Sequence, residues 1–75
     1  MNNNLQILNQ INALEMLIME YYMDGKKYYE IANILHISKK SVSANIKSVI
    51  SKLKAKNAIH SAVILTKILK NLNPL

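Results

Sequence analysis

The sequence predicts an all-α domain of four helices. Apolar residues recur at helical spacing in four segments, near residues 12–23, 28–35, 39–53 and 58–72. Short breaks that contain helix-capping or helix-stopping residues separate these segments. With 75 residues the chain has the length of one domain. A core of this size is marginal on its own, so we expect part of the apolar surface to be buried against a second chain.

Residues 1–11 are expected to form an N-terminal arm, and residues 12–73 the helical domain. The arm begins with an asparagine run and then carries Leu5, Leu8 and Ile11. Their spacing fits either a short helical turn or a contact in a dimer, and the sequence leaves these two interpretations open.

The first helix is expected to begin after Asn12 and to end at Asp24-Gly25. Asn12 can accept a hydrogen bond from a free amide of the first turn, and Glu15 stands three residues later, where a capping box needs a carboxylate. Gly25 can adopt the left-handed conformation that ends helices. The residues expected to face the core are Leu14, Leu17, Ile18 and Tyr21.

The second helix, over 28–35, is followed by a break of three residues, His36-Ile37-Ser38. Ile37 is an apolar residue within this break, and Ser38 is a good N-cap for the helix that follows. Two helices joined by so tight a turn are typical of a helix-turn-helix. The second helix is expected to bury Ile31, Ile34 and Leu35.

The third helix, over 39–53, has two faces of opposite character. One is an apolar stripe at positions i, i+4, i+7, i+8 and i+11, made of Val42, Ile46, Val49, Ile50 and Leu53. The other carries small or basic residues and no acid, namely Lys40, Ser43, Ala44, Lys47, Ser51 and Lys54.

A helix that enters the major groove of DNA needs a face of this second kind. Small residues allow close approach, hydroxyls bond to bases or phosphates, and lysine reaches guanine acceptors or phosphate. An ordinary solvated helix face more often mixes glutamate with lysine. The absence of acids therefore favours DNA binding over a merely solvated surface.

Charge is divided unevenly along the chain, whose formal net charge is +6. All the acids lie within the first thirty residues: Glu15, Glu20, Asp24 and Glu30. The lysines beyond Glu30 are Lys39, Lys40, Lys47, Lys52, Lys54, Lys56, Lys67 and Lys70. Such a basic half predicts a polyanionic partner, for which nucleic acid and acidic lipid are both candidates; the alternative is a soluble basic surface.

The last helix, over 58–72, has more apolar residues than one core stripe needs. We therefore expect a two-fold dimer contact there, with a broader core of the single chain as the alternative. The residues expected in this dimer interface are Ile64, Leu65, Ile68, Leu69 and Leu72.

Catalytic and metal chemistry is not expected. The chain has no cysteine, and neither His36 nor His60 has a carboxylate at ligand spacing. Ser38 and Ser41 have no histidine or acid placed to activate a nucleophile. We therefore predict no enzyme activity, no metal and no cofactor. No signal peptide and no stretch of about 18 apolar residues is evident, so a cytoplasmic location without membrane contact is expected.

Two stretches, EIANILHISKKSVSANIKSVISKL (30–53) and KAKNAIHSAV (54–63), resemble the LuxR-type (GerE/NarL-type) helix-turn-helix DNA-binding domain. The matching positions are Glu30-Ile31-Ala32, Leu35, Ile37-Ser38, Ser41-Val42, Ile50 and Lys52-Leu53, together with Gly25, Glu15 and Ile18. The resemblance extends over about residues 11–70 without a gap.

This resemblance implies a transcription regulator whose third helix lies in the major groove. The family's base-contacting positions fall on Ser43, Ala44 and Lys47. Its phosphate-contacting positions fall on Ser38, Lys40, Ser41 and Lys54, with Lys39 close by. Family members dimerise through the last helix, so a homodimer on an imperfect palindrome of double-stranded DNA is expected. An activator would also contact RNA polymerase, and no residues for that contact stand out.

The chain departs from the family pattern at several positions. It contains no arginine, Lys54 replaces the glycine usual after Lys-Leu, and Ala58 stands where arginine is frequent. Lysine is a less directional donor than arginine, so modest base discrimination is expected. Two alternatives stay open: a protein-interaction module that sequesters a related regulator as a heterodimer, and the DNA-binding segment of a sigma factor.

Overall fold

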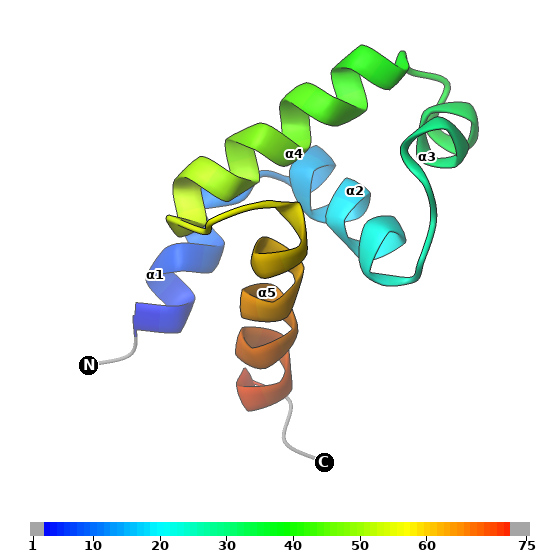
Figure 1. Cartoon of the computed structure of the whole chain (residues 1–75). Helices are drawn as coiled ribbons and strands as arrows, with labels where there is room; N and C mark the ends of the chain where they lie inside the picture. The colour runs from blue at the N-terminus through cyan, green and yellow to red at the C-terminus, as the bar shows by residue number, and fades with distance from the viewer. Residues whose placement is uncertain (1–2, 73–75) are drawn as a thin grey trace.

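The computed structural model describes the backbone of residues 3–72 and the side chains of residues 6–72 (Figure 1). The helices are α1 (Asn3–Gln10), α2 (Ala13–Met23), α3 (Tyr28–Leu35), α4 (Lys39–Leu53) and α5 (Ala58–Leu72). No strand occurs in the described part of the chain, as the all-α prediction requires. In Figure 1, α4 lies across the top of the molecule, α2 and α5 lie beneath it, and α3 lies beside its N-terminal end.

Helix α1 is an addition to the four predicted helices. It forms within the segment expected to be an arm, and it contacts α4. Ile7 and Leu8 pack against the core, and Ile11, just beyond the helix, is buried. Ile7 and Ile11 are four residues apart, so both point to the same side when the backbone is helical, and this side lies against the domain.

The capping box at the start of α2 is confirmed. The Asn12 side-chain oxygen accepts from the Glu15 backbone N–H at 2.8 Å, and a Glu15 carboxylate oxygen accepts from the Asn12 N–H at 2.9 Å. The predicted buried side of α2 is partly wrong. Leu14 and Leu17 are 42% and 38% exposed, whereas Met19 is fully buried. The rotation of α2 is set by Ile18, Met19 and the Glu15 carboxylate, which all face α4 or the core.

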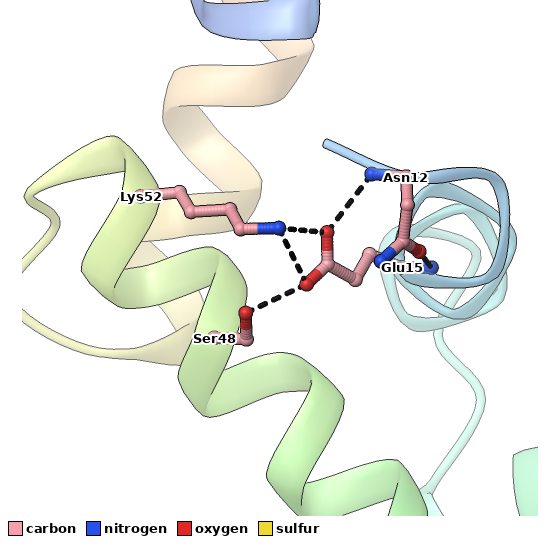
Figure 2. A network of polar contacts seen from close by, with 4 residues as sticks. All are labelled: Asn12, Glu15, Ser48 and Lys52. Carbon is pink, nitrogen blue, oxygen red and sulfur yellow. Dashed lines mark hydrogen bonds and ion pairs between the residues drawn. The ribbon is translucent and has the colours of Figure 1, made fainter. Parts of the chain in front are cut away.

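Glu15 is a buried carboxylate that joins α2 to α4 (Figure 2). Its side chain is 4% exposed and pairs with Lys52, whose Nζ lies 2.7 and 2.9 Å from the two carboxylate oxygens. The Ser48 hydroxyl donates a further hydrogen bond at 2.6 Å. Burial by itself would raise the pKa of the Glu15 carboxyl, but the hydrogen bonds from Lys52, Ser48 and the Asn12 amide together hold that pKa below its ordinary value.

Helix α3 contacts both α2 and α4. Ile31 and Ala32 are buried, but Ile34, which was predicted to face the core, is 42% exposed. A helix of two turns presents one narrow side to its neighbours, and Ile31 and Ala32 occupy that side. The rings of Tyr22 and Tyr28 meet edge to face, with centroids 5.9 Å apart, and connect α2 to α3.

Most of the core is the predicted stripe of α4 packed onto α2, α3 and α5. The stripe residues Val42, Ile46, Val49 and Leu53 are buried, and Ile50 is half-buried. From α5 the buried residues are Ser61, Leu65 and Ile68. The Ser61 hydroxyl donates to the Ala58 carbonyl at 2.6 Å, so the buried hydroxyl has a hydrogen-bond partner.

Lys54 ends α4 in the left-handed conformation, with φ 55° and ψ 37°. Its N–H donates to the Ile50 and Ser51 carbonyls, which closes the last turn of the helix. A side chain in this conformation costs about 1 kcal/mol, a strain that glycine avoids. Lys54 is thus a strained residue at the position where the resembling family carries glycine.

Replacing Glu15 by glutamine should destabilise the fold at pH 7 by about 1–3 kcal/mol, because Lys52 and Ser48 lose a charged partner. The pKa of Glu15 is lowered by folding, so its contribution is present at neutral pH and is lost as the pH falls below about 4.5. The free energy of unfolding of Glu15→Gln should therefore depend less on pH in acid than that of the unaltered chain. Urea unfolding between pH 7 and pH 3 measures this.

The matched control is Glu20→Gln, because Glu20 is exposed on the same helix. Equal losses of stability for the two variants at pH 7 would contradict the role assigned to Glu15.

Replacing Lys54 by glycine should raise the free energy of unfolding by about 0.5–1 kcal/mol, because it relieves the left-handed strain. Lys56→Gly is the control: Lys56 lies in the same α4–α5 connection and is not among the residues with positive φ. Glycine there adds only flexibility to the unfolded chain and should lower the stability slightly. Thermal unfolding compares the two, and a destabilised Lys54→Gly variant would rule out the strain.

Candidate nucleic-acid interface

Helices α3 and α4 form a helix-turn-helix. His36 leaves α3 in the left-handed conformation, with φ 57°, and the Ile37 N–H returns to the Ala32 carbonyl at 3.0 Å. Ile37 is half-buried against the core. Ser38 then starts α4 as its N-cap and accepts from the Ser41 N–H at 2.9 Å. The predicted break is thus a tight, internally bonded turn that fixes α4 relative to α3.

The predicted polar face of α4 lies on the outside of the molecule. Lys40, Ala44, Lys47, Ser51 and Lys54 are exposed, and Ser43 is half-buried at the edge of the face. We call these six residues the α4 ridge. From Lys40 to Lys54 the ridge extends about 21 Å along the helix axis. Because the opposite side of α4 is packed in the core, the ridge is held on a rigid element.

The α4 ridge has no carboxylate to neutralise it. Among the described side chains the one ion pair joins Lys52 to Glu15, and it lies on the inner side of α4. Glu30 accepts from the Lys27 N–H at the start of α3, and Glu20 and Asp24 belong to α2 and its C-terminal cap. The lysines of the ridge are therefore free to bind an anion.

The residues predicted to contact phosphate lie at the two ends of α4. Ser38, Lys39 and Lys40 are exposed at its N-terminus, where free backbone N–H groups also favour an anion, and Lys54 is exposed at its C-terminus. Ser41 is half-buried. The Ser38 oxygen accepts within the cap, which leaves its hydroxyl proton able to donate.

The residues predicted to contact bases lie between these two ends. Lys47 and Ala44 are exposed, and Ser43 is half-buried beside them. The structure therefore brings Ser43, Ala44 and Lys47 together on one side of the helix, with basic groups before and after them. This order suits a helix that enters a groove between two phosphate backbones.

Two residues of α4 have structural partners that the sequence reasoning missed. Lys52, counted among the basic residues, is paired with Glu15. The Asn45 amide donates to the Ser41 carbonyl at 2.8 Å. The family pattern held a signal for the first pair, since Glu15 and Lys52 are both matching positions.

The predicted dimer residues of α5 do not form one exposed face, and this prediction needs correction. Leu65 is fully buried and Ile68 is 5% exposed, because both pack into the core of the single chain. Ile64 and Leu69 are half-buried, and Leu72 is 39% exposed.

Exposed apolar surface on α5 lies elsewhere, at Ile59 (69% exposed) and Val63 (44%). These residues are four apart and share the outer face of α5 with Thr66, Lys67 and Lys70, which are also exposed. Apolar residues occur on several sides of α5, so the sequence held no local signal for the side that faces inward.

The described side chains include no group of three histidine, cysteine or acidic residues placed to hold a metal ion. His36 is exposed, and the His60 Nδ1 atom accepts from the Lys56 N–H at 3.0 Å. Within residues 3–72, no helix has the length and apolar character needed to cross a membrane.

A scan against protein families matches residues 10–65 to a family described as bacterial regulatory proteins, luxR family. No curated protein and no solved structure gives a match. The matched range holds α2, the helix-turn-helix of α3 and α4, and the first half of α5. It covers well over half of the chain and includes the α4 ridge. The chain therefore belongs to the luxR family of bacterial regulatory proteins and carries that family's helix-turn-helix DNA-binding domain.

Proposed function

We propose that the protein regulates transcription by binding double-stranded DNA as a homodimer. In each subunit α4 enters the major groove of one half-site of an imperfect palindrome. Ser43, Ala44 and Lys47 face the base edges, and Ser38, Lys39, Lys40, Ser41 and Lys54 contact phosphates. A protein bound to bacterial chromosomal DNA works in the cytoplasm, at the nucleoid.

The α4 ridge is the observation that carries this proposal. Three of its six residues are exposed lysines, no carboxylate faces it, and the helix beneath it is fixed by a buried stripe. The absence of acids does not stabilise a helix whose face contacts only solvent. It does favour binding to DNA, because acids on that face would repel the phosphates.

The kind of specificity follows from the lysines. Lys47 is the longest donor in the middle of the ridge, and its ammonium lacks the planar fork with which arginine binds guanine at two points. The affinity should therefore depend largely on phosphate contacts, and base discrimination should be modest. A dimer that contacts about 6–8 phosphates should give a slope of roughly −5 to −7 when the logarithm of the binding constant is plotted against that of salt concentration.

The outer face of α5 supports dimerisation. Ile59 and Val63 expose apolar surface, and nothing in the described part of the chain covers them. We assign the dimer contact to these two residues, in place of the buried Leu65 and Ile68.

Replacing Lys47 by alanine should weaken binding to the preferred DNA sequence, by about 1–2 kcal/mol per half-site, and should reduce the preference for that sequence. The sequence is first obtained by selection from random DNA with the unaltered protein, and binding is then measured by fluorescence anisotropy at two salt concentrations. Lys70→Ala is the matched control for charge, because Lys70 is exposed in the last turn of α5 and is not part of α4. Sedimentation confirms that this variant still dimerises.

Lys40→Ala should behave differently from Lys47→Ala. Loss of a phosphate contact should weaken binding to all sequences alike and make the salt slope shallower by about 2 for the dimer. If Lys47→Ala leaves both affinity and sequence preference unchanged, the placement of α4 in the groove is wrong.

Replacing Val63 by glutamate should prevent dimerisation without unfolding the subunit, because Val63 is exposed on α5. Sedimentation should give a monomer, and the salt slope should fall to about half, since one subunit then contacts half as many phosphates. Asn71→Glu places the same charge at another exposed position of α5 and should leave the dimer intact. A dimer that survives Val63→Glu would exclude this face as the contact.

A further inference from the structure

An apolar groove runs between the C-terminal end of α2, the α2–α3 connection and α5. It consists of two adjoining hollows, of about 520 and 300 Å³, which share Met23, Ile59 and Ala62. The larger hollow continues over Tyr22 and Tyr28, and the smaller one over Val63 and Thr66. No residue of α4 lines either hollow, so the groove is separate from the α4 ridge.

The edges of the groove are basic. Lys26 and Lys27 line the larger hollow and Lys67 the smaller one, and no acidic residue lines either. Asp24 is next to Met23 in the sequence, but it does not line the groove. None of these three lysines pairs with a carboxylate in the described residues. The surface is thus a strip of apolar side chains with cations at both ends.

The dimensions of this strip suit a helix. Along α5 the lining runs from Ile59 to Lys67, which is about 12 Å of helix. An amphipathic helix of three turns would place an apolar ridge over Met23, Ile59 and Val63. Acidic residues near one end of this helix would meet Lys26 and Lys27, and acidic residues near the other end would meet Lys67. This charge pattern complements the groove.

A second copy of the chain complements the groove less well. Its outer α5 face carries Lys67 and Lys70 and no acid, so a homodimer leaves the groove lysines facing more positive charge. We propose that the groove binds an acidic amphipathic helix of another protein.

Binding of such a helix has a consequence for regulation, and this part rests on the proposed function. Ile59 and Val63 line the groove and are also the residues assigned to the dimer contact. One surface cannot hold both occupants, so the acidic partner separates the subunits. DNA affinity then falls although no residue of the α4 ridge is touched.

The test uses two synthetic helical peptides of 18 residues that share an apolar stripe of leucines at i, i+4, i+7 and i+11. One peptide carries glutamate at its other positions, and its counterpart carries lysine there. Binding of the labelled peptides to the full chain is followed by anisotropy, and the mass of the complex by sedimentation. We expect the acidic peptide to bind and to shift the protein from dimer to monomer, and the basic peptide not to bind.

Two matched double substitutions locate the binding surface. Lys26→Gln with Lys27→Gln should lower the affinity for the acidic peptide roughly fivefold or more, and Lys67→Gln alone should also lower this affinity. Lys39→Gln with Lys40→Gln removes the same charge from α4 and should change peptide affinity less than about twofold while sharply reducing DNA binding. Thermal unfolding confirms that each variant is folded.

The proposal is overturned if the acidic peptide does not bind or if both peptides bind equally. It is also overturned if the double substitution of Lys39 and Lys40 weakens peptide binding as much as that of Lys26 and Lys27. A complex in which peptide and dimer coexist would refute the competition alone. The DNA-binding proposal is tested separately, by measuring the DNA affinity and sequence preference of Lys47→Ala. The two proposals can therefore fail independently.

Discussion

The hydrogen bonds and the ion pair of the Glu15 carboxylate are the interactions on which the placement of α4 depends. The carboxylate caps α2 through the Asn12 amide, and it holds α4 through Lys52 and Ser48. A buried carboxylate without such partners would be strongly unfavourable, so α2 and α4 must sit in the one arrangement that provides them. This contact lies on the side of α4 that faces α2, about a third of a turn around the helix from the ridge. One side chain thus caps α2 and also holds the orientation of the α4 ridge.

Much of the fold could be predicted from local signals. Helix spacing and caps gave α3, α4 and α5 at their observed bounds, and Asn12 with Glu15 gave the start of α2. The errors concern which side of a helix faces inward. Leu14, Leu17 and Ile34 are apolar but exposed, because a short helix in a small domain buries only one narrow side. The local pattern could not predict that Glu15 is buried while nearby leucines are exposed. The burial of Glu15 depends on its contact with Lys52, which is 37 residues away in the sequence.

The candidate site was more predictable than the proposed dimer surface, for a physical reason. The distinguishing property of the α4 ridge is that it has no acids, and their absence over four turns is visible in the sequence itself. On α5 nearly every turn has apolar residues on several sides, so composition alone does not separate core from surface. Only packing against α2 and α4 shows that Leu65 and Ile68 face inward and that Ile59 and Val63 do not.

The separation of charge within so small a domain has an effect before any contact forms. Exposed acids are confined to α2 and its cap, while the ridge of α4 carries unpaired lysines. The α4 ridge is therefore a side of the subunit with positive charge and no acid, and the field of a DNA duplex attracts that side during diffusion. In the proposed binding mode, approaching molecules turn the lysine side toward the phosphates, and fewer encounters are lost to the wrong orientation. This orienting effect weakens over about 8 Å at physiological ionic strength, so it acts on the last step of the approach.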